Sequence, residues 1–527
     1  MTDEDATGGE DDPDTGADAD ADEVGDEPTD ERLRDLPRED PLAAVSPLDG
    51  RYADRTAPLS PYASEAALMR ARTRVEVEYL IELAALEATP IELDDDATAA
   101  LRDCYESFSG ADARLIKQLE TDGAAGYTAT NHDVKAVEYF LRVRLTKLAA
   151  GASEVDDETA RGGDGSPQPA PIDDAEALFP WIHFGLTSED VNNLAQRLLV
   201  EAAVTDVLVP AIRAVRDTLV DLAHEHRDTP MLARTHGQPA TPTTFGKEMA
   251  VYAARLGRAI GRVEAAVDDL SGKLAGASGT YAAHVAAYPD VDWQAASRSL
   301  VGRLGLDHQP LATQVNPCDD LAALFDALRG VNGVLLDLNV DAWLYVSDRY
   351  LGQRAVEGET GSSTMPHKVN PIDFENSEGN LSKANSDLTF LGDYVTSSRL
   401  QRDLSDSTVK RNIGAAFAHC LIGYSKTTDG LATVVPNEVV MREALEATPE
   451  VIGEAVQTIL RREGDTEAYE RVKALSRGAQ VSIDDFHELF DDLDVDPDVR
   501  AELRALTPAG YTGIAADLAE HPAVDGD

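Results

Sequence analysis

The chain has 527 residues, and 97 Asp or Glu against 46 Lys or Arg give it a formal net charge of −51. A surface this acidic repels phosphodiester backbones, which excludes duplex nucleic-acid binding as its main activity. The sequence has no run of about 18 or more apolar residues, and its N-terminal stretch is acidic, so a membrane span and a secretory signal are both disfavoured. The three cysteines (Cys104, Cys318, Cys420) are too widely spaced for a disulfide framework or a zinc cluster, and we expect a cytoplasmic protein.

Residues 1–40 form an acidic tail with 18 acidic residues and three Arg among many Ala, Gly, Thr and Pro. Such a segment buries too little apolar surface to offset its ordering entropy, so we expect it to be disordered. The rest still carries 79 acidic against 43 basic residues, and Lys (10) is scarce beside Arg (36). One hypothesis is a halophilic protein, because at about 1 M salt the Debye length is only ~3 Å and self-repulsion is screened. The alternative is an ordinary acidic enzyme with an acidic tail.

Residues 41–176 are expected to form a mixed, mostly helical N-terminal domain. Its last part, about 151–176, carries eight acidic residues, one Arg and several Gly and Pro. Such a composition is typical of a solvated surface insertion between two ordered regions.

Long apolar stripes at helical spacing dominate residues 177–431. One runs without a slip from Met249 to Leu274, a second from Leu324 to Tyr345, and a third from Leu208 to Leu222. The first stripe alone predicts about 37 Å of helix. These stripes predict an all-α protein with a central bundle of long helices, followed by a small C-terminal helical domain at 432–527. Stripes of this length favour oligomerisation through the bundle; a monomeric bundle is the alternative.

A polar, glycine-rich segment, residues 358–376, interrupts the helices. It contains Gly358 and Gly361, three hydroxyl residues (Ser362, Ser363, Thr364) and Lys368. Its residues alone indicate an anion-binding loop, and its spacing differs from that of a P-loop. A serine here could equally be a turn residue that caps its own loop.

The segment GSSTMPHKVNP (361–371) resembles the signature loop of the fumarase/aspartase superfamily, whose members eliminate fumarate from succinyl compounds. Five further segments narrow the resemblance to the bacterial adenylosuccinate lyase family: SPLDGRYAD (46–54), TNHDVKAVEYF (130–140), HFGLTSEDVNN (183–193), RTHGQPATPTTFGKEMA (234–250) and QRDLSDSTVKRN (401–412). The resemblance extends from about residue 42 to about residue 520. It leaves out the acidic tail and the insertion.

The resemblance implies a three-domain, fumarase/aspartase-like fold and β-elimination of fumarate from N6-succinyl-AMP and from succinyl-aminoimidazole carboxamide ribotide. It assigns Ser362 as the base that removes a proton next to a carboxylate, with Lys368 and Asn370 stabilising the charge that develops. Ser363 is the alternative base. His236 would protonate the leaving nitrogen, and Glu375 would orient the ring. Without the resemblance, a lone histidine is more often structural.

The resemblance also implies a set of substrate-binding residues at both ends of the substrate. His183 is a second candidate for the proton-carrying histidine, although a binding role suits it better. Guanidinium groups pair well with phosphate oxygens, although any single Arg is by default a surface ion-pair residue. The predicted binding residues are Arg51, Tyr52, Asn131, His132, Asp133, His183, Thr187, Ser188, Gln314, Lys368, Asn370, Asn376, Arg402, Ser407, Thr408 and Arg411.

In the family, these segments meet only where subunits join, so the resemblance implies a homotetramer with three chains at each active site. No metal site is predicted, because His224 and His226 point to different sides of a helix, and the chemistry requires no cofactor. We expect small-molecule nucleotide substrates, and neither nucleic acid nor membrane as a partner. Two other hypotheses remain: another fumarate-releasing lyase (argininosuccinate lyase, fumarase or aspartase), or a catalytically silent scaffold with the same bundle.

Overall fold

A computed structural model describes residues 40–150, 172, 174–354, 369–476 and 481–526. The predicted tail up to residue 39 and most of the predicted insertion lie outside these residues. The chain divides into two units, residues 1–53 and 54–527. In the described part of the first unit, Asp40 caps a short 3-10 helix (Pro41–Ala43) and the chain then turns, with the Tyr52 N–H donating to the Pro47 carbonyl at 2.9 Å.

The second unit begins with a group of helices that surrounds α3. Ser64 caps α3 by accepting a hydrogen bond from the Ala67 N–H at 3.1 Å. Most of α3 is buried, including several charged residues, because α4, α6 and α8 all pack against it. The helices before and around it are α1 (Ala53–Thr56), α2 (Ser60–Ala63), α3 (Glu65–Ala84), α4 (Asp95–Glu106), α5 (Gly110–Thr121), α6 (Asp133–Ala150) and α7 (Ala175–Leu178).

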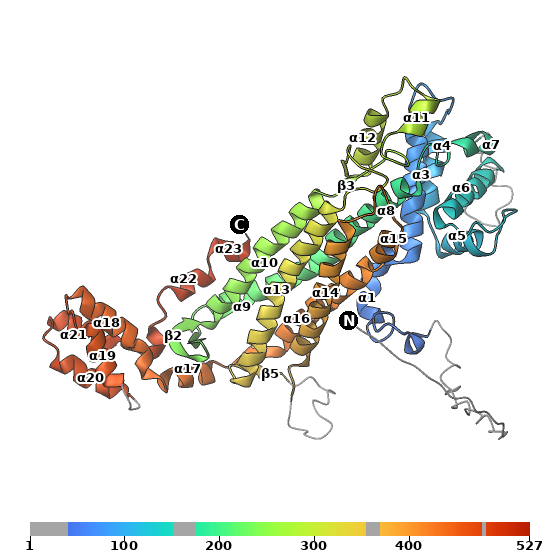
Figure 1. Cartoon of the computed structure of the whole chain (residues 1–527). Coiled ribbons are helices and arrows are strands. Elements are labelled where there is room, and N and C mark those ends of the chain that lie inside the picture. The colour runs from blue at the N-terminus through green and yellow to red at the C-terminus, as the bar shows by residue number, and fades with distance from the viewer. Residues whose placement is uncertain (1–39, 151–171, 173, 355–368, 477–480, 527) are drawn as a thin grey trace, which may run out of the picture. The chain divides into compact units, whose positions relative to one another are not determined.

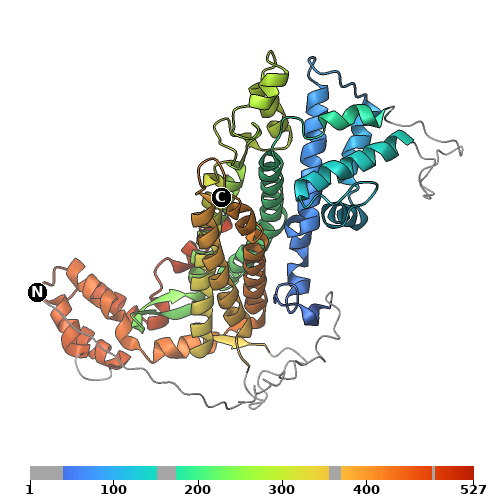
Figure 2. The same cartoon turned by 45° about the vertical axis from the view of Figure 1, so that its right-hand side comes forward.

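Long helices form the centre of the second unit. α14 packs along both α13 and α16, and α10 packs along α9 and α13; Figures 1 and 2 show these helices side by side from two directions. The apolar stripe on α13 is buried, as its spacing predicted, except for its last residue, Tyr345, which is half-buried. The bounds are α8 (Ser188–Ala203), a π-helical turn (Val204–Leu208), α9 (Val209–Glu225), α10 (Phe245–Asp268), α13 (Asp319–Ser347), α14 (Ile372–Val395), α15 (Ser405–Lys410) and α16 (Ile413–Thr433).

Helix α10 ends earlier than its apolar stripe. We predicted one helix from Met249 to Leu274, but α10 stops at Asp268 and an extended segment follows. Leu270 and Leu274 are still buried. A Cβ on Gly272 would lie 2.3 Å from a Leu194 methyl carbon, so the extended chain passes close to α8 at this glycine. The apolar positions were right, and the backbone conformation was wrong.

Strands are few and short in the described chain. β1 (Pro230–Thr235) and β2 (Gln238–Thr244) form an antiparallel hairpin, β3 (Ser271–Gly272) pairs in parallel with β4 (Asp307–His308), and β5 (Leu351–Gln353) pairs with β6 (Val434–Pro436). Two small helices, α11 (Ala282–Ala287) and α12 (Trp293–Arg303), lie between β3 and β4 in sequence. The predicted all-α class is therefore confirmed.

The C-terminal helices build a hydrophobic core of their own. Phe486, Phe490, Ile452 and Leu503 belong to it, together with Leu232 from β1. The helices are α17 (Glu438–Glu446), α18 (Gly453–Arg462), α19 (Ala468–Ser476), α20 (Ile483–Asp492), α21 (Pro497–Ala505), α22 (Ala515–Ala519) and α23 (Pro522–Asp525). α22 and α23 return to pack on α10. The predicted C-terminal domain, like the rest of the three-domain division, stays a proposal. No described helix is both long and apolar enough to span a membrane.

Candidate active site

The N-terminus of α8 carries two of the predicted residues, Thr187 and Ser188. The Thr187 N–H donates to the Asp190 carboxylate at 2.9 Å, which fixes the first turn of the helix. The Asp190 carboxylate also forms an ion pair with Lys273 at 2.7 Å, and both side chains are fully buried. The Lys273 ammonium donates to the backbone carbonyl of Gln314 at 2.9 Å. The helix end and the Gln314 segment are therefore tied together.

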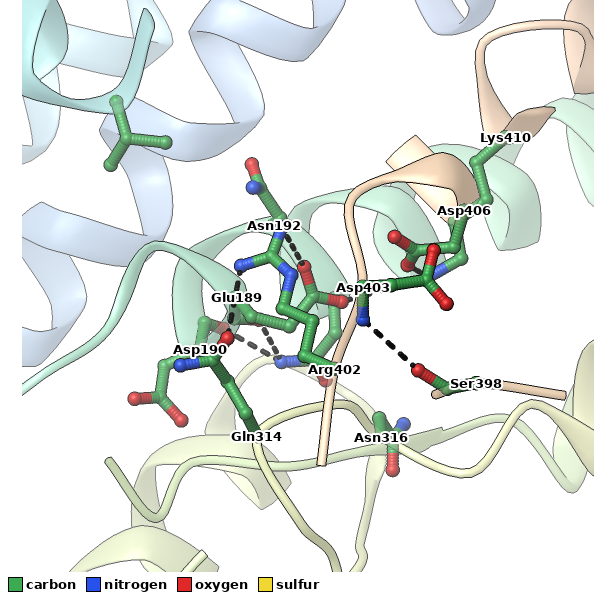
Figure 3. Close-up of polar contacts among 12 residues, drawn as sticks. Glu189, Asp190, Asn192, Gln314, Asn316, Ser398, Arg402, Asp403, Asp406 and Lys410 are labelled. Carbon is green, nitrogen blue, oxygen red and sulfur yellow. Dashed lines mark hydrogen bonds and ion pairs between the residues drawn. The ribbon is translucent and has the colours of Figure 1, made fainter. Parts of the chain in front are cut away.

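Arg402 lies beside the N-terminus of α8 and contacts Glu189 and Gln314 (Figure 3). Its guanidinium donates to the Gln314 amide oxygen at 3.5 Å and lies 3.4 Å from the buried Glu189 carboxylate. The other Glu189 oxygen lies 3.6 Å from the Lys410 ammonium, which also bonds to Asp406 at 2.8 Å. Glu189 therefore lies between two cations. The Glu189 and Asp406 carboxylates balance the charges of Arg402 and Lys410, and Arg402 is the more exposed of the two cations.

A second cationic contact joins Arg411, at the end of α15, to Asp133 at the start of α6. The Arg411 guanidinium lies 3.2 Å from Asp133 and 2.6 Å from Glu65. Asp133 is also paired with the buried Arg72 at 2.8 Å. Burial would raise the Asp133 carboxyl pKa, but Arg72, the backbone N–H of Val134 and Arg411 outweigh burial and lower the pKa. Asn131 and His132, both exposed, precede Asp133 in the same turn.

His183 is held by Glu76 of α3. The His183 ring Nδ1 lies 2.5 Å from one Glu76 oxygen, and the His183 backbone N–H donates to the other at 3.1 Å. Ser407 and Thr408 lie on α15, between Arg402 and Arg411 in sequence. The structure thus brings one set of predicted residues to the same end of the bundle: Asp133, His183, Thr187, Ser188, Gln314, Arg402, Ser407, Thr408 and Arg411.

Another set lies at the opposite end of α14. Asn370 precedes the first turn of α14, Glu375 lies in that turn, and Asn376 follows it. Glu375 is exposed and accepts a hydrogen bond from the Trp343 indole at 3.1 Å. The predicted contact between Glu375 and His236 stays a prediction. Ser362, Ser363 and Lys368 lie outside the described residues.

His236 is at the tip of the β1–β2 hairpin. Thr235 pairs with Gln238, so His236 and Gly237 form a two-residue turn, with φ of 53° and 72°. A positive φ at both central residues is the geometry that hairpins favour, and Gly237 meets it without strain. The turn exposes the imidazole to solvent. Arg234, beside the turn, forms an ion pair with Asp348 at the end of α13 at 3.3 Å.

The length of α14 separates two of these groups within one chain. Asn370 and Glu375 lie at its N-terminal end, and Arg402 follows its C-terminal end. A helix of 24 residues is about 36 Å long, which is much longer than a nucleotide. One chain therefore cannot present both sets to a single substrate molecule. Arg51 and Tyr52 belong to the first unit, so they are assigned to neither of these two sets.

Known proteins match nearly all of this chain. A lyase family model matches residues 50–385, and the adenylosuccinate lyase C-terminal model matches residues 398–512. Adenylosuccinate lyases of Haemophilus influenzae and Dictyostelium discoideum are each 41% identical, over 91% and 90% of this chain and 98% of their own length. The chain belongs to the adenylosuccinate lyase family. It is a carbon–nitrogen lyase, and the predicted family and enzyme class are confirmed.

Solved structures show the same fold at low identity. A fumarate lyase from Mesorhizobium sp. BNC1 superposes with a TM-score of 0.68 at 21% identity, covering 90% of this chain and 98% of that one. A 3-carboxy-cis,cis-muconate lactonizing enzyme from Pseudomonas putida gives 0.65 at 20% identity, covering 89% and 96%. The fumarase/aspartase-like fold class is therefore confirmed.

Sequence reasoning missed the buried charged residues that contact the predicted site residues. Arg72 and Glu76 lie on α3, and Glu189 lies one residue after Ser188. All three are buried. The available signal was the run of charged residues inside α3, a helix that apolar neighbours would otherwise place in a core, since buried charges are rare unless they are paired.

Proposed function

We propose that this lyase eliminates fumarate from N6-succinyl-AMP to leave AMP, and from succinyl-aminoimidazole carboxamide ribotide to leave the carboxamide ribotide. The observation that carries the proposal is 41% identity to an adenylosuccinate lyase over 91% of the chain. The arrangement of cations supports it: the partly exposed Arg402 and the exposed Arg411 lie at one end of the bundle, where phosphate and carboxylate groups could bind.

The chemistry requires a base, an acid and a place for negative charge. Proton removal next to a carboxylate creates a doubly negative intermediate, so the site must supply positive potential at that carboxylate. In this proposal Ser362 removes the proton, and Lys368 and Asn370 hold the carboxylate. His236 then donates a proton to the leaving nitrogen, and its exposed position at a turn leaves it free to meet another chain.

The nucleotide end would bind at the α8 end of the bundle. Arg402 and Arg411 would hold the phosphate with Ser407 and Thr408, and Thr187 and Ser188 would hold the succinyl carboxylates. Arg411 already contacts Glu65 and Asp133, and a phosphate would replace one anionic partner by another. The remaining predicted residues, Arg51, Tyr52, Asn131, His132, Gln314 and Asn376, would complete the contacts to substrate.

We also propose a homotetramer in which several chains contribute to each site. The separation along α14 requires at least two chains, and an antiparallel pair would bring opposite bundle ends together. Exposed apolar residues on the bundle, Val340, Trp343 and Leu344 of α13 and Phe390 of α14, support self-association. A cytoplasmic location is proposed because the three cysteines are unpaired and buried.

A complementation experiment tests the shared site. Ser362→Ala and His236→Ala chains, each inactive alone, are mixed under conditions that permit subunit exchange. If the two residues reach a site from different chains, about a quarter of the sites in randomly mixed tetramers regain both. The matched control mixes Ser362→Ala with Lys368→Ala, since both lesions lie in one segment and no site can regain both residues. Absence of activity in the first mixture contradicts the shared site.

A substrate panel tests the reaction. Fumarate release is followed from succinyl-AMP, argininosuccinate and L-malate at matched concentrations. Cleavage of succinyl-AMP alone supports the proposal, and release only from argininosuccinate or malate favours another lyase of the superfamily. No release from any of them favours the silent scaffold.

A further inference from the structure

We propose that Glu76 is a positioning residue that keeps His183 as a charged imidazolium aimed at an anionic group of the nucleotide substrate. The inference deepens the proposed function and rests on it for the identity of the substrate. It concerns a residue of α3 that no sequence motif includes.

Both oxygens of Glu76 contact the same residue. One lies 2.5 Å from His183 Nδ1, and the other accepts the His183 backbone N–H at 3.1 Å. The Glu76 side chain is fully buried and that of His183 is 16% exposed. A two-point contact fixes the ring and the backbone together, so the ring has one orientation. With Nδ1 engaged, Nε2–H is the donor left for a substrate.

Helix α3 also fixes the turn that carries His183. Tyr79 lies one helical turn after Glu76 on the same face, and its hydroxyl donates to the Phe184 carbonyl at 2.7 Å. The same hydroxyl lies 3.0 Å from the buried His284 ring. A Cβ on Gly185 would lie 2.8 Å from that ring, so the turn is packed tightly. His183 itself has a φ of 59°, a left-handed conformation that costs energy and persists because these contacts over-determine it.

The charges around His183 single out Glu76. Burial alone would lower the pKa of the His183 imidazole, but the neighbouring carboxylates, Glu76 foremost, together outweigh burial and the pKa is raised. Glu138 of α6 and Asp190 of α8 act in the same direction, but each has its own ammonium partner, Lys135 at 2.6 Å and Lys273 at 2.7 Å. Of the other groups near Glu76, Arg72 is paired with Asp133 at 2.8 Å. The pKa of His284 is lowered by burial, which leaves that ring neutral.

The protonation state decides what His183 offers a substrate. An imidazolium donates from Nε2 and attracts an anion, and a partly exposed charge beside the α8 end suits that purpose. Because the folded-state pKa is raised, the imidazolium persists at lower pH and is lost as pH rises through that pKa. Substrate binding should weaken over the same range.

The experiment compares pH profiles of kcat and KM for succinyl-AMP in the wild type, Glu76→Gln and Glu82→Gln. Glu76→Gln should move the alkaline limb of kcat/KM to lower pH by about one to three units, mainly through KM. At pH values below the shifted limb its KM should return toward the wild-type value. Glu82→Gln is the matched control: it removes a buried carboxylate of the same helix that pairs with Arg303 at 2.6 Å. Its alkaline limb should stay in place.

An unchanged limb in Glu76→Gln, or a loss of activity that is equal at every pH, overturns the proposal. A second measurement does not depend on turnover. In 13C-histidine-labelled protein, the His183 signal is identified by its disappearance in His183→Gln, and its titration midpoint should fall in Glu76→Gln. A midpoint that does not fall contradicts the inference. If the wild type does not cleave succinyl-AMP, the proposed function fails, and the titration still decides whether Glu76 charges His183.

Discussion

For His236, an experiment can distinguish the effect of the turn conformation from the effect of the imidazole that is proposed as the acid. It occupies a left-handed position in a two-residue turn, with Gly237 beside it. Asn tolerates that conformation better than most residues, so His236→Asn preserves the turn and removes the imidazole. The melting temperature should stay at the wild-type value.

We expect His236→Asn to lower kcat for succinyl-AMP by on the order of 10²–10⁴, because protonation of the leaving nitrogen loses its donor. Steady-state kinetics with succinyl-AMP measures the loss. Gln238→Ala, two residues along at the foot of the same turn, is the control and should keep most of the activity. A His236→Asn enzyme with near wild-type kcat would remove His236 from the acid role.

The predicted site residues came from motifs, and motifs are local in sequence. They gave Thr187, Ser188 and Arg402 by resemblance, and the structure places these three at one end of the bundle. The motifs could not predict the partner of His183, because Glu76 is 107 positions away in sequence and contacts His183 only through the packing of α3. Periodicity can show that a helix is buried, but it does not show which charged residue faces which turn.

At the scale of elements, the apolar stripes predicted the long helices well. The stripe from Leu324 to Tyr345 became α13, and the one from Met249 became α10. The end of α10 was missed, because an extended segment can bury the same leucines as a helix. The extended segment passes close to α8 at Gly272, a tertiary contact that the stripe does not encode.

The crossing of α9 and α10 depends on another glycine, Gly246. A Cβ there would lie 2.4 Å from the Ala223 carbonyl oxygen and 2.6 Å from the Arg227 backbone. Backbone atoms cannot move aside as a side chain can, so Gly246→Ala should force the two helices apart. We expect a loss of about 1–3 kcal/mol or more in the free energy of unfolding.

Gly257→Ala, on the same helix α10, is the matched control, because no atom lies within 4 Å of the added Cβ. It should leave stability unchanged or raise it by up to about 1 kcal/mol, since Ala favours a helix more than Gly does. Denaturant unfolding of both variants measures the difference. A Gly246→Ala chain as stable as Gly257→Ala would mean that the two helices can separate at no cost.

At the scale of the whole molecule, opposite ends of a long bundle carry different parts of the proposed site. Sequence motifs could not show this, because residues 370 and 402 are only a short distance apart in sequence although α14 separates them by about 36 Å. The same helix that separates them within a chain would let an antiparallel copy bring them together. In the proposed assembly, oligomerisation is part of catalysis, and a monomeric form should be inactive.

The net charge of −51 makes the stability of the whole molecule a test of the halophilic hypothesis. Mutual repulsion among carboxylates destabilises the compact state, and salt screens it: the Debye length falls from ~10 Å at about 0.1 M to ~3 Å at about 1 M. We expect the melting temperature to rise by roughly 5 °C or more between about 0.1 M and about 1 M KCl. Differential scanning calorimetry measures it.

Two controls separate screening from other effects of salt. Sucrose stabilises by exclusion from the protein surface and screens no charge. It should therefore raise the melting temperature at any fixed KCl concentration, and the further rise with KCl should remain. A chain that lacks residues 1–39 should keep most of the KCl effect, because most of the acidic residues lie outside that segment. If the full chain is most stable at low salt, the acidity is that of an ordinary acidic enzyme and the halophilic hypothesis is wrong.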